Sequence, residues 1–314
     1  MAQVARGTGL VAAGLGWGTA IGVALGALII APAVDGTLEN GHVFSRGSAD
    51  GAANGSGSGE GNRTGSGEGG AQDGTALKDQ PAQRQAGEAN ELLADASSQL
   101  VKGALDGRSV LIISTASASD EDTAAVRWLA NKAGASDAGG FRLTEKFTDQ
   151  QSADELSSII ANTLPAGAQL SVENRSPGTH AGESLGAAVA IDPSTGSPAA
   201  SGGDRSLVLG ALEQAGFVDS TRDVNPADMI LVVTGDAGTA DGSGDTFGVK
   251  VLTDFAAALS GHCDTVLASQ GEAADVAGDD GASVATVGDV DTEAGRIRTV
   301  LAAGKLAEQQ GQHQ

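Results

Sequence analysis

Hydrophobic and polar positions divide the chain into regions of different character. From residue 7 to residue 34 no side chain is charged, and a helix of this length crosses a hydrocarbon core of about 30 Å. Residues 47–75 hold no aliphatic side chain larger than alanine, so they lack the apolar surface that offsets the entropy of ordering. We therefore expect an anchor at residues 1–35, a flexible Gly/Ser-rich tether at 36–89, a folded domain at 90–306 and a disordered tail at 307–314.

The pattern after residue 90 predicts an α/β fold. Continuous apolar runs at 109–115, 228–234 and 264–269 are typical of strands that are buried on both faces. Amphipathic stretches lie between these runs, so we expect right-handed crossovers and a mostly parallel sheet that helices cover on both faces. The expected helices span residues 90–104, 119–134, 152–163, 182–190, 205–215, 247–259 and 293–306.

The uncharged N-terminal segment predicts a single transmembrane helix. Arg6 precedes it, and Asp35 and Glu39 follow it, which favours a cytoplasmic N-terminus and an extracytoplasmic domain at the plasma membrane. A cleaved signal peptide is the alternative, because residues 31–33 resemble a cleavage site; its apolar core would exceed the usual length of about 7–15 residues. Glycines at every fourth position share one helix face and predict oligomerisation or pairing with another membrane protein. These helix-packing residues are Gly14, Gly18, Gly22 and Gly26.

Charge and composition exclude some functions. The net charge is −22, so the phosphate backbone of a nucleic acid is repelled and we expect no nucleic-acid partner. Aromatic residues make up 3% of the chain, so the core must be built of aliphatic side chains. The chain has 1 cysteine, Cys263, which forms no disulfide within one copy.

The glycine-rich loop at residues 235–245 follows a strong strand, where α/β proteins commonly hold phosphates. Asp236, Asp241 and Asp245 occur in it, and neither a Walker arrangement nor GxGxxG spacing is present, so a phosphate would meet like charge. The aspartates are the ligand type for a hard cation, but their spacing does not match a calcium loop. We favour a solvated acidic loop over either site.

Residues 182–186, GESLG, match the nucleophile-elbow pattern GxSxG, and Ser184, Asp236 and His262 have the chain order of an α/β-hydrolase triad. An elbow must follow a strand directly, whereas Pro177 and its neighbours predict a loop before this serine. Small residues that open a helix are the plainer explanation of the motif. We therefore expect no catalytic residue and a non-enzymatic protein.

One pair of residues is a candidate metal site. His262 and Cys263 are adjacent between a predicted helix and a predicted strand, and imidazole and thiolate are ligands for copper and zinc. A buried thiol beside a capping imidazole is the structural alternative. We expect no resident cofactor.

Several stretches distributed in order along the domain carry a resemblance to a known family. They are residues 103–126, 164–171, 181–189, 208–217 and 287–302, among them GALDGRSVLIISTASASDEDTAAV and VGDVDTEAGRIRTVLA. On these stretches the chain resembles the actinobacterial copper transport family MctB, which also includes corynebacterial cell-separation proteins of the SteB type. None of them is a catalytic or metal-binding motif.

The resemblance implies a role in the cell envelope, either in copper transport and homeostasis or in cell separation with a cytosolic partner. Family members resemble a charged coiled coil after the membrane helix, whereas this chain has a Gly/Ser-rich tether. The sequence thus predicts a non-enzymatic, single-pass envelope protein that works as a tethered oligomeric or partner-binding module. Copper is its candidate ligand, and a SteB-type scaffold for cell separation is the alternative.

Overall fold

The computed structural model describes residues 73–219, 221, 223–236, 246–271 and 284–311. The chain divides into a unit at residues 1–68 and a unit at residues 69–314, and the described residues all belong to the second. The expected anchor, with Gly14, Gly18, Gly22 and Gly26, lies outside them. Within the described ranges, no helix combines the length and the apolar character needed to cross a membrane.

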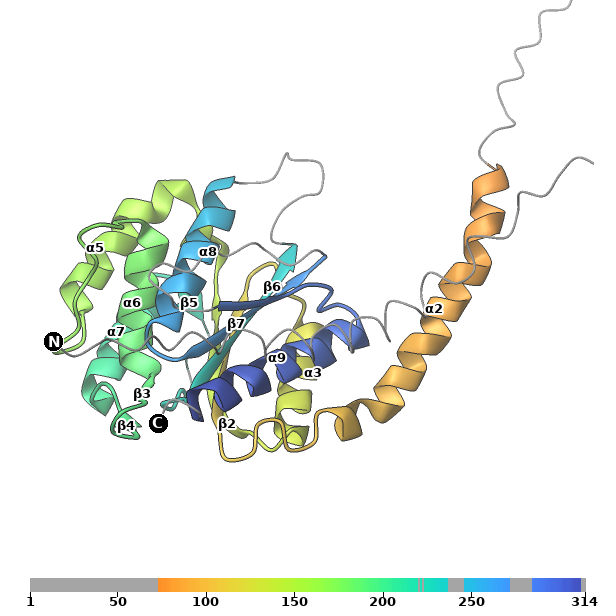
Figure 1. Cartoon of the computed structure of the whole chain (residues 1–314). Coiled ribbons are helices and arrows are strands. Elements are labelled where there is room, and N and C mark those ends of the chain that lie inside the picture. The colour runs from red at the N-terminus through yellow and green to blue at the C-terminus, as the bar shows by residue number, and fades with distance from the viewer. Residues whose placement is uncertain (1–72, 220, 222, 237–245, 272–283, 312–314) are drawn as a thin grey trace, which may run out of the picture. The chain divides into compact units, whose positions relative to one another are not determined.

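A six-stranded, mostly parallel sheet forms the centre of the domain (Figure 1). The strand order is β5-β2-β1-β6-β7-β8, and every neighbouring pair is parallel except β2 with β5. The strands are β1 (Ser109–Thr115), β2 (Ser136–Leu143), β5 (Val218–Asp219), β6 (Met229–Asp236), β7 (Asp264–Gln270) and β8 (Val284–Val287). A separate two-stranded hairpin consists of β3 (Ile191–Asp192) and β4 (Ser197–Pro198).

Helices lie on both sides of the sheet, as the alternating pattern predicts (Figure 1). On one side the core contains residues of α4 (Glu145–Thr148), α5 (Ala153–Thr163), α6 (Pro177–Val189), α7 (Gly202–Gln214) and α8 (Thr246–Ser260). On the other side it contains residues of α3 (Asp120–Lys132) and α9 (Glu293–Gly311), with α2 (Asp73–Leu100) packed against them. A 3₁₀ turn at Gln150–Ser152 leads into α5.

The central strands explain why two layers of helices are needed. Leu111 and Ile113 of β1 belong to the core beneath α5–α8, whereas Val110 and Ile112 belong to the core beneath α3 and α9. All four side chains are at most 2% exposed. Because successive side chains of a strand point to opposite faces, each face of this apolar strand has to be covered.

Several boundaries differ from the sequence prediction. Helix α6 begins at Pro177, where we expected a loop, because proline suits the first turn of a helix and Ser176 caps it. Helix α2 begins at Asp73, so residues 73–89, which we expected to belong to the tether, are helical; residues with high helix propensity such as Ala, Leu, Lys, Gln and Glu follow Thr75. Helix α9 continues to Gly311, beyond the expected end at residue 306. Ala307 is 7% exposed and belongs to the core beneath α3 and α9, which explains why the helix extends into the expected tail.

The glycines of α6 allow an unusually close approach to α8. Gly178, Gly182 and Gly186 recur every fourth residue and therefore share one face of the helix. A Cβ atom at Gly182 would lie 2.5 Å from the carbonyl oxygen of Phe255. The GESLG sequence is thus part of a helix–helix contact within the core.

Replacing Gly182 by alanine tests this packing. The added methyl group would also lie 2.6 Å from Cβ of Ala258, so we expect Gly182→Ala to lower the free energy of unfolding by about 1–3 kcal/mol through overpacking. Gly210→Ala is the matched control, because a Cβ atom there meets nothing within 4 Å and gains about 0.5–1 kcal/mol from helix propensity. Urea unfolding of the full-length chain, followed by circular dichroism, measures both; equal stability of the two variants would refute the packing account.

Candidate functional site

The carboxyl edge of the sheet is the first place to look for a site. In doubly wound α/β folds, ligands commonly bind where the strand order reverses, which here is the boundary between β1 and β6. The two strand ends are joined there by hydroxyl groups. Thr115 Oγ1 donates to Thr234 Oγ1 at 3.0 Å, and Ser117 Oγ accepts a hydrogen bond from the Gly235 amide at 3.2 Å.

The backbones also meet at this boundary. A Cβ atom at Gly235 would overlap the carbonyl oxygen of Ser117, so the segments that leave β1 and β6 are in direct contact. Thr115 and Thr234 are 5% and 2% exposed. The described ends of β1 and β6 are therefore in direct contact at this boundary.

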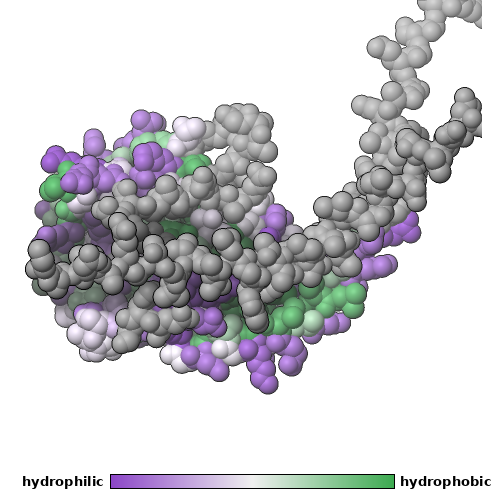
Figure 2. Space-filling model, viewed as in Figure 1, coloured by the Kyte–Doolittle hydropathy of each residue, from purple (hydrophilic) through white to green (hydrophobic). Residues whose placement is uncertain are grey.

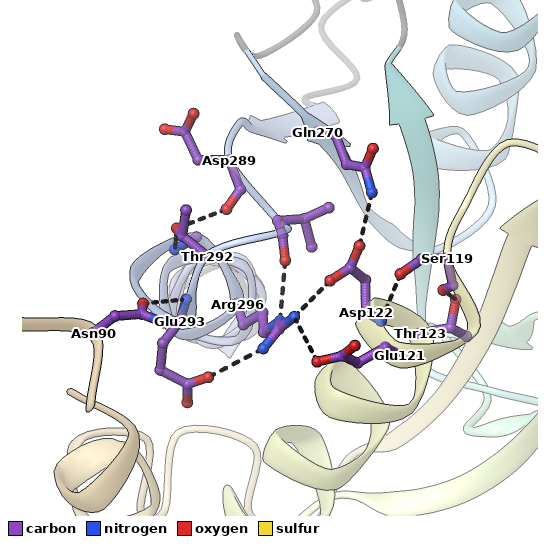
Figure 3. A network of polar contacts seen from close by, with 12 residues as sticks. Asn90, Ser119, Glu121, Asp122, Thr123, Gln270, Asp289, Thr292, Glu293 and Arg296 are labelled. Atoms are coloured by element: carbon purple, nitrogen blue, oxygen red, sulfur yellow. Dashed lines mark hydrogen bonds and ion pairs between the residues drawn. The ribbon is translucent and has the colours of Figure 1, made fainter. Parts of the chain in front are cut away.

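A buried ion pair lies next to this edge (Figure 3). Arg296 Nη2 of α9 is 2.6 Å from Asp122 Oδ1 of α3, and their side chains are 13% and 5% exposed. Gln270, the last residue of β7, donates from Nε2 to Asp122 Oδ2 at 2.8 Å. Glu293 lies on the opposite side of the guanidinium, 3.5 Å from Nη1. The network thus joins the first turn of α3, the end of β7 and the first turn of α9.

Helix α2 also contacts this network. The side-chain oxygen Oδ1 of Asn90 accepts a hydrogen bond from the Glu293 amide at 3.0 Å (Figure 3). The first amides of a helix lack partners within the helix, so Asn90 satisfies one of them for α9. Through this bond, α2, which begins within the expected tether, is attached to the network around Asp122.

Opposing effects determine the pKa of Asp122. Burial raises it, but hydrogen bonds from Arg296, Ser119 and Gln270, together with the positive charge of Arg296, outweigh burial and lower the pKa below the usual aspartate value. Asp122 is therefore ionised at neutral pH. Its carboxylate is bound to donors from β7 and α9, so the network connects these elements to α3.

The residues of the hydrolase triad considered above are not brought together. Ser184 lies in the middle of α6, is 0% exposed, and its Oγ has no hydrogen-bond partner among the described residues. Asp236 ends β6 at the carboxyl edge, whereas His262 precedes β7 at the amino edge. Asp241 and Asp245 of the acidic loop lie outside the described residues.

The amino edge of the sheet contains a pocket of about 200 Å³. His262 and Cys263 both line it, so the structure places the two candidate ligands beside one cavity. Their positions are fixed by α8, which ends at Ser260, and by β7, which begins at Asp264. The other residues that line it are Arg108, Ile191, Pro193, Gly196 and Asp228.

Burial controls the acid–base chemistry of this pair. Burial lowers the pKa of His262, which keeps the imidazole neutral at neutral pH. Burial and the carboxylates of Asp264 and Asp228 raise the pKa of Cys263 to about 12, against a hydrogen bond with Thr265, so the thiol is protonated. Within the described ranges, no group of three or more His, Cys, Asp or Glu side chains has an arrangement that holds a metal ion.

Sequence reasoning missed the Asp122–Arg296 network and the pocket lining from the β3–β4 hairpin. Arg296 does carry a signal in the sequence, because it interrupts the apolar face of a predicted helix, and a buried arginine requires a partner. The sequence does not indicate which residue is that partner, because Asp122 lies 174 positions before Arg296 in the chain.

The fold is that of a doubly wound α/β protein. At the carboxyl edge of its sheet, hydroxyl groups join the ends of β1 and β6. The amino edge carries a pocket. Comparison with known proteins identifies the family. The family described as "Copper transport outer membrane protein, MctB" matches residues 9–313, and the chain belongs to this family.

Named relatives agree with this assignment. The protein called "Copper transporter MctB" from Mycobacterium tuberculosis (strain ATCC 25618 / H37Rv) is 36% identical over 222 residues, which cover 67% of this chain and 70% of the relative. The protein of that name from Mycobacterium bovis matches to the same extent, 36% over 222 residues. Its namesake from Mycobacterium leprae (strain TN) is 35% identical over 219 residues, or 65% of this chain and 68% of the relative.

Removing Arg296 tests whether the buried ion pair supports the fold. Arg296→Met leaves the Asp122 carboxylate buried without its cation, so we expect a loss of about 3–5 kcal/mol in the free energy of unfolding. Arg298→Met is the matched control, because Arg298 pairs with Asp289 on the surface, where both side chains are more than half exposed, and should cost at most about 1 kcal/mol. Urea unfolding measures both variants.

The pH dependence of the unfolding free energy tests whether the ionised form of Asp122 is responsible for this loss. Because the folded-state pKa of Asp122 is lowered, its contribution is complete above the unfolded aspartate pKa of about 4 and is lost as pH falls through the folded value. The stability difference between the parent and Arg296→Met should therefore shrink below about pH 4. A difference that is constant from neutral to acidic pH would contradict the assigned role of Asp122.

Proposed function

We propose that this chain serves copper transport or homeostasis in the cell envelope as a non-enzymatic, membrane-tethered α/β module. The observation that carries the proposal is the family match over residues 9–313. Mycobacterial relatives that are 35–36% identical bear the name copper transporter.

The carboxyl edge supports a non-enzymatic role. Thr115 and Thr234 join β1 to β6 by a hydrogen bond of 3.0 Å at the boundary where folds of this class commonly bind substrates and cofactors. Ser184, the residue that matched a nucleophile motif, is 0% exposed. A substrate could reach this hydroxyl group only if part of α6 unfolded.

The membrane arrangement is the part of the proposal that rests on sequence. Residues 7–34 carry no charge and meet the length requirement for one membrane-spanning helix. In this proposal the N-terminus is cytoplasmic, residues 1–35 remain attached as the anchor, and the domain acts outside the plasma membrane. Gly14, Gly18, Gly22 and Gly26 then form the face at which two such helices, or this helix and another membrane protein, pack together.

A SteB-type scaffold for cell separation is the second candidate, and the surface of α2 favours it. Leu92 and Leu100 are 71% and 51% exposed, and hydrophobic residues gather along the C-terminal half of α2 in Figure 2. Hydrophobic residues gathered on an exposed helix surface are typical of a surface that binds another protein. A scaffold works by binding other proteins through such a surface. A copper-transport module would need the surface only to assemble with other subunits.

Deleting the gene in its native host tests the copper function. We expect the deletant to accumulate copper and to grow poorly on copper, because the family role is lost, and we expect the parent chain to restore both. A chain that lacks residues 1–35 is the matched control and should fail to restore them. Normal copper content in the deletant would reject the proposal, and chains of unseparated cells with normal copper would support the scaffold instead.

The glycine face is tested by cross-linking in membranes. Leucine side chains at Gly18 and Gly22 would hold the helix backbones apart, so Gly18→Leu with Gly22→Leu should reduce self-association or partner recovery several-fold. The control pair Ala12→Leu and Ala20→Leu adds side chains of the same size at positions outside the glycine repeat. Unchanged cross-linking of the glycine variant would show that the spacing has no role in assembly.

A further inference from the structure

The pocket at the amino edge of the sheet has room for a small molecule. Its volume is about 200 Å³, which is below the range of about 300–1,000 Å³ typical of pockets for drug-sized ligands. Arg108 precedes β1 and Asp228 precedes β6, so two charged residues enter the lining where neighbouring strands begin. The rest of the lining is Ile191, Pro193 and Gly196 of the β3–β4 hairpin, with His262 and Cys263. The pocket therefore suits a ligand of only a few non-hydrogen atoms.

Arg108 and Asp228 place opposite charges on the pocket wall, and no ion pair joins them to each other. A neutral group holds each side chain. Nη2 of Arg108 donates to the Ala307 carbonyl oxygen at 3.1 Å, and Oδ2 of Asp228 accepts from the amide and the hydroxyl group of Ser109 at 2.8 and 2.6 Å. Among the described residues, no partner is bound to Nη1 of Arg108 or to Oδ1 of Asp228. The pocket thus presents one fixed cation and one fixed anion to a ligand.

His262 and Cys263 add no charge to the pocket at neutral pH. Burial lowers the pKa of His262, whereas burial and the Asp264 carboxylate raise the pKa of Cys263 to about 12. A neutral imidazole has one nitrogen that donates and one that accepts. The ring's position is restricted, because a Cβ atom at Gly186 would lie 2.5 Å from its Cδ2 atom. His262 is therefore a fixed, uncharged hydrogen-bonding group beside the two charges.

This lining disfavours ligands that carry a single kind of charge. A metal ion would meet the guanidinium of Arg108, and no group of three His, Cys, Asp or Glu side chains among the described residues is arranged to hold one. A phosphate or a dicarboxylate would meet Asp228 and, outside the lining, the Asp264 carboxylate that interacts with Arg108. An uncharged ligand would take water from both charges without replacing it. A ligand with one positive and one negative group satisfies both.

We propose that the amino-edge pocket binds a small free α-amino acid, with its carboxylate at the Arg108 guanidinium and its ammonium group at Oδ1 of Asp228. The planar guanidinium suits a carboxylate, and a charge-assisted bond at each end of the ligand fixes its orientation. Ile191 and Pro193 line the same small pocket, so the ligand's side chain is short and uncharged. The inference goes beyond the proposed copper function and does not depend on it.

Titration of the full-length chain in detergent micelles with L-alanine, followed by NMR of isotope-labelled histidine rings, tests the site. Of the described histidines, His262 lines the pocket, whereas the His180 ring is bound to the Ser171 carbonyl oxygen at 3.0 Å outside the lining. We expect saturable shifts of the His262 signals and unchanged His180 signals. His262 signals that stay unchanged up to high millimolar alanine would overturn the proposal.

Two capped forms of alanine test the recognition of each charge in the parent chain, without relying on a variant that folds. N-acetyl-L-alanine lacks the ammonium group and L-alaninamide lacks the carboxylate. Each should bind at least about tenfold more weakly than alanine, because each loses one hydrogen-bonded charge. Equal binding of alanine and either capped form would show that the corresponding charge is not recognised and would overturn the proposal.

Replacing Asp228 by asparagine tests the assigned contact of the ammonium group. Asp228→Asn keeps an oxygen that accepts from Ser109 but removes the charge, so we expect alanine affinity to fall by at least about tenfold. Asp254→Asn is the matched control, because Asp254 lies on α8, pairs with Lys250 at 2.9 Å and is outside the pocket lining; it should retain the parent affinity. Equal affinity of the parent and a folded Asp228→Asn chain would contradict the assignment.

Discussion

Burial of β1, β6 and β7 between two layers of helices is the constraint on which the domain depends. Leu111 and Leu231 are both 0% exposed although they belong to the cores on opposite faces of the sheet. Each face must exclude water, because apolar area returned to solvent costs about 25 cal/mol per Å². This requirement accounts for the contact between α6 and α8, where Gly178 and Gly182 leave room for the α8 backbone.

Because both faces of the sheet are covered, its polar groups lie at its two edges. At the carboxyl edge, Thr115 bonds to Thr234 and Asp122 bonds to Arg296, so the polar groups there connect elements of the fold. At the amino edge, Asp228 is fixed by Ser109, while His262 and Cys263 line a pocket. Proteins of this fold class commonly bind ligands at the carboxyl edge of the sheet. In this domain the described polar groups of the carboxyl edge bond to one another, and the pocket lies at the amino edge.

Much of the fold follows from the apolar pattern. The strand expected at residues 109–115 has the same bounds as β1, because a strand that is buried on both faces leaves an unbroken apolar run. Short elements carry no such signal: β8 has four residues and the β3–β4 strands have two each. Only part of the amino-edge pocket could be predicted from the sequence. His262 and Cys263 are adjacent in the chain, but the pocket beside them is also lined by residues as distant as Arg108 and Gly196.

The central proposal is that an uncleaved N-terminal anchor holds the α/β module outside the plasma membrane. Its most direct test is the intact mass of the chain recovered from membranes of whole cells, with and without prior treatment by an external protease. Our account predicts a membrane-bound chain that retains residues 1–35 and loses its domain to the protease. A chain released into the medium and beginning after Ala33 would contradict it.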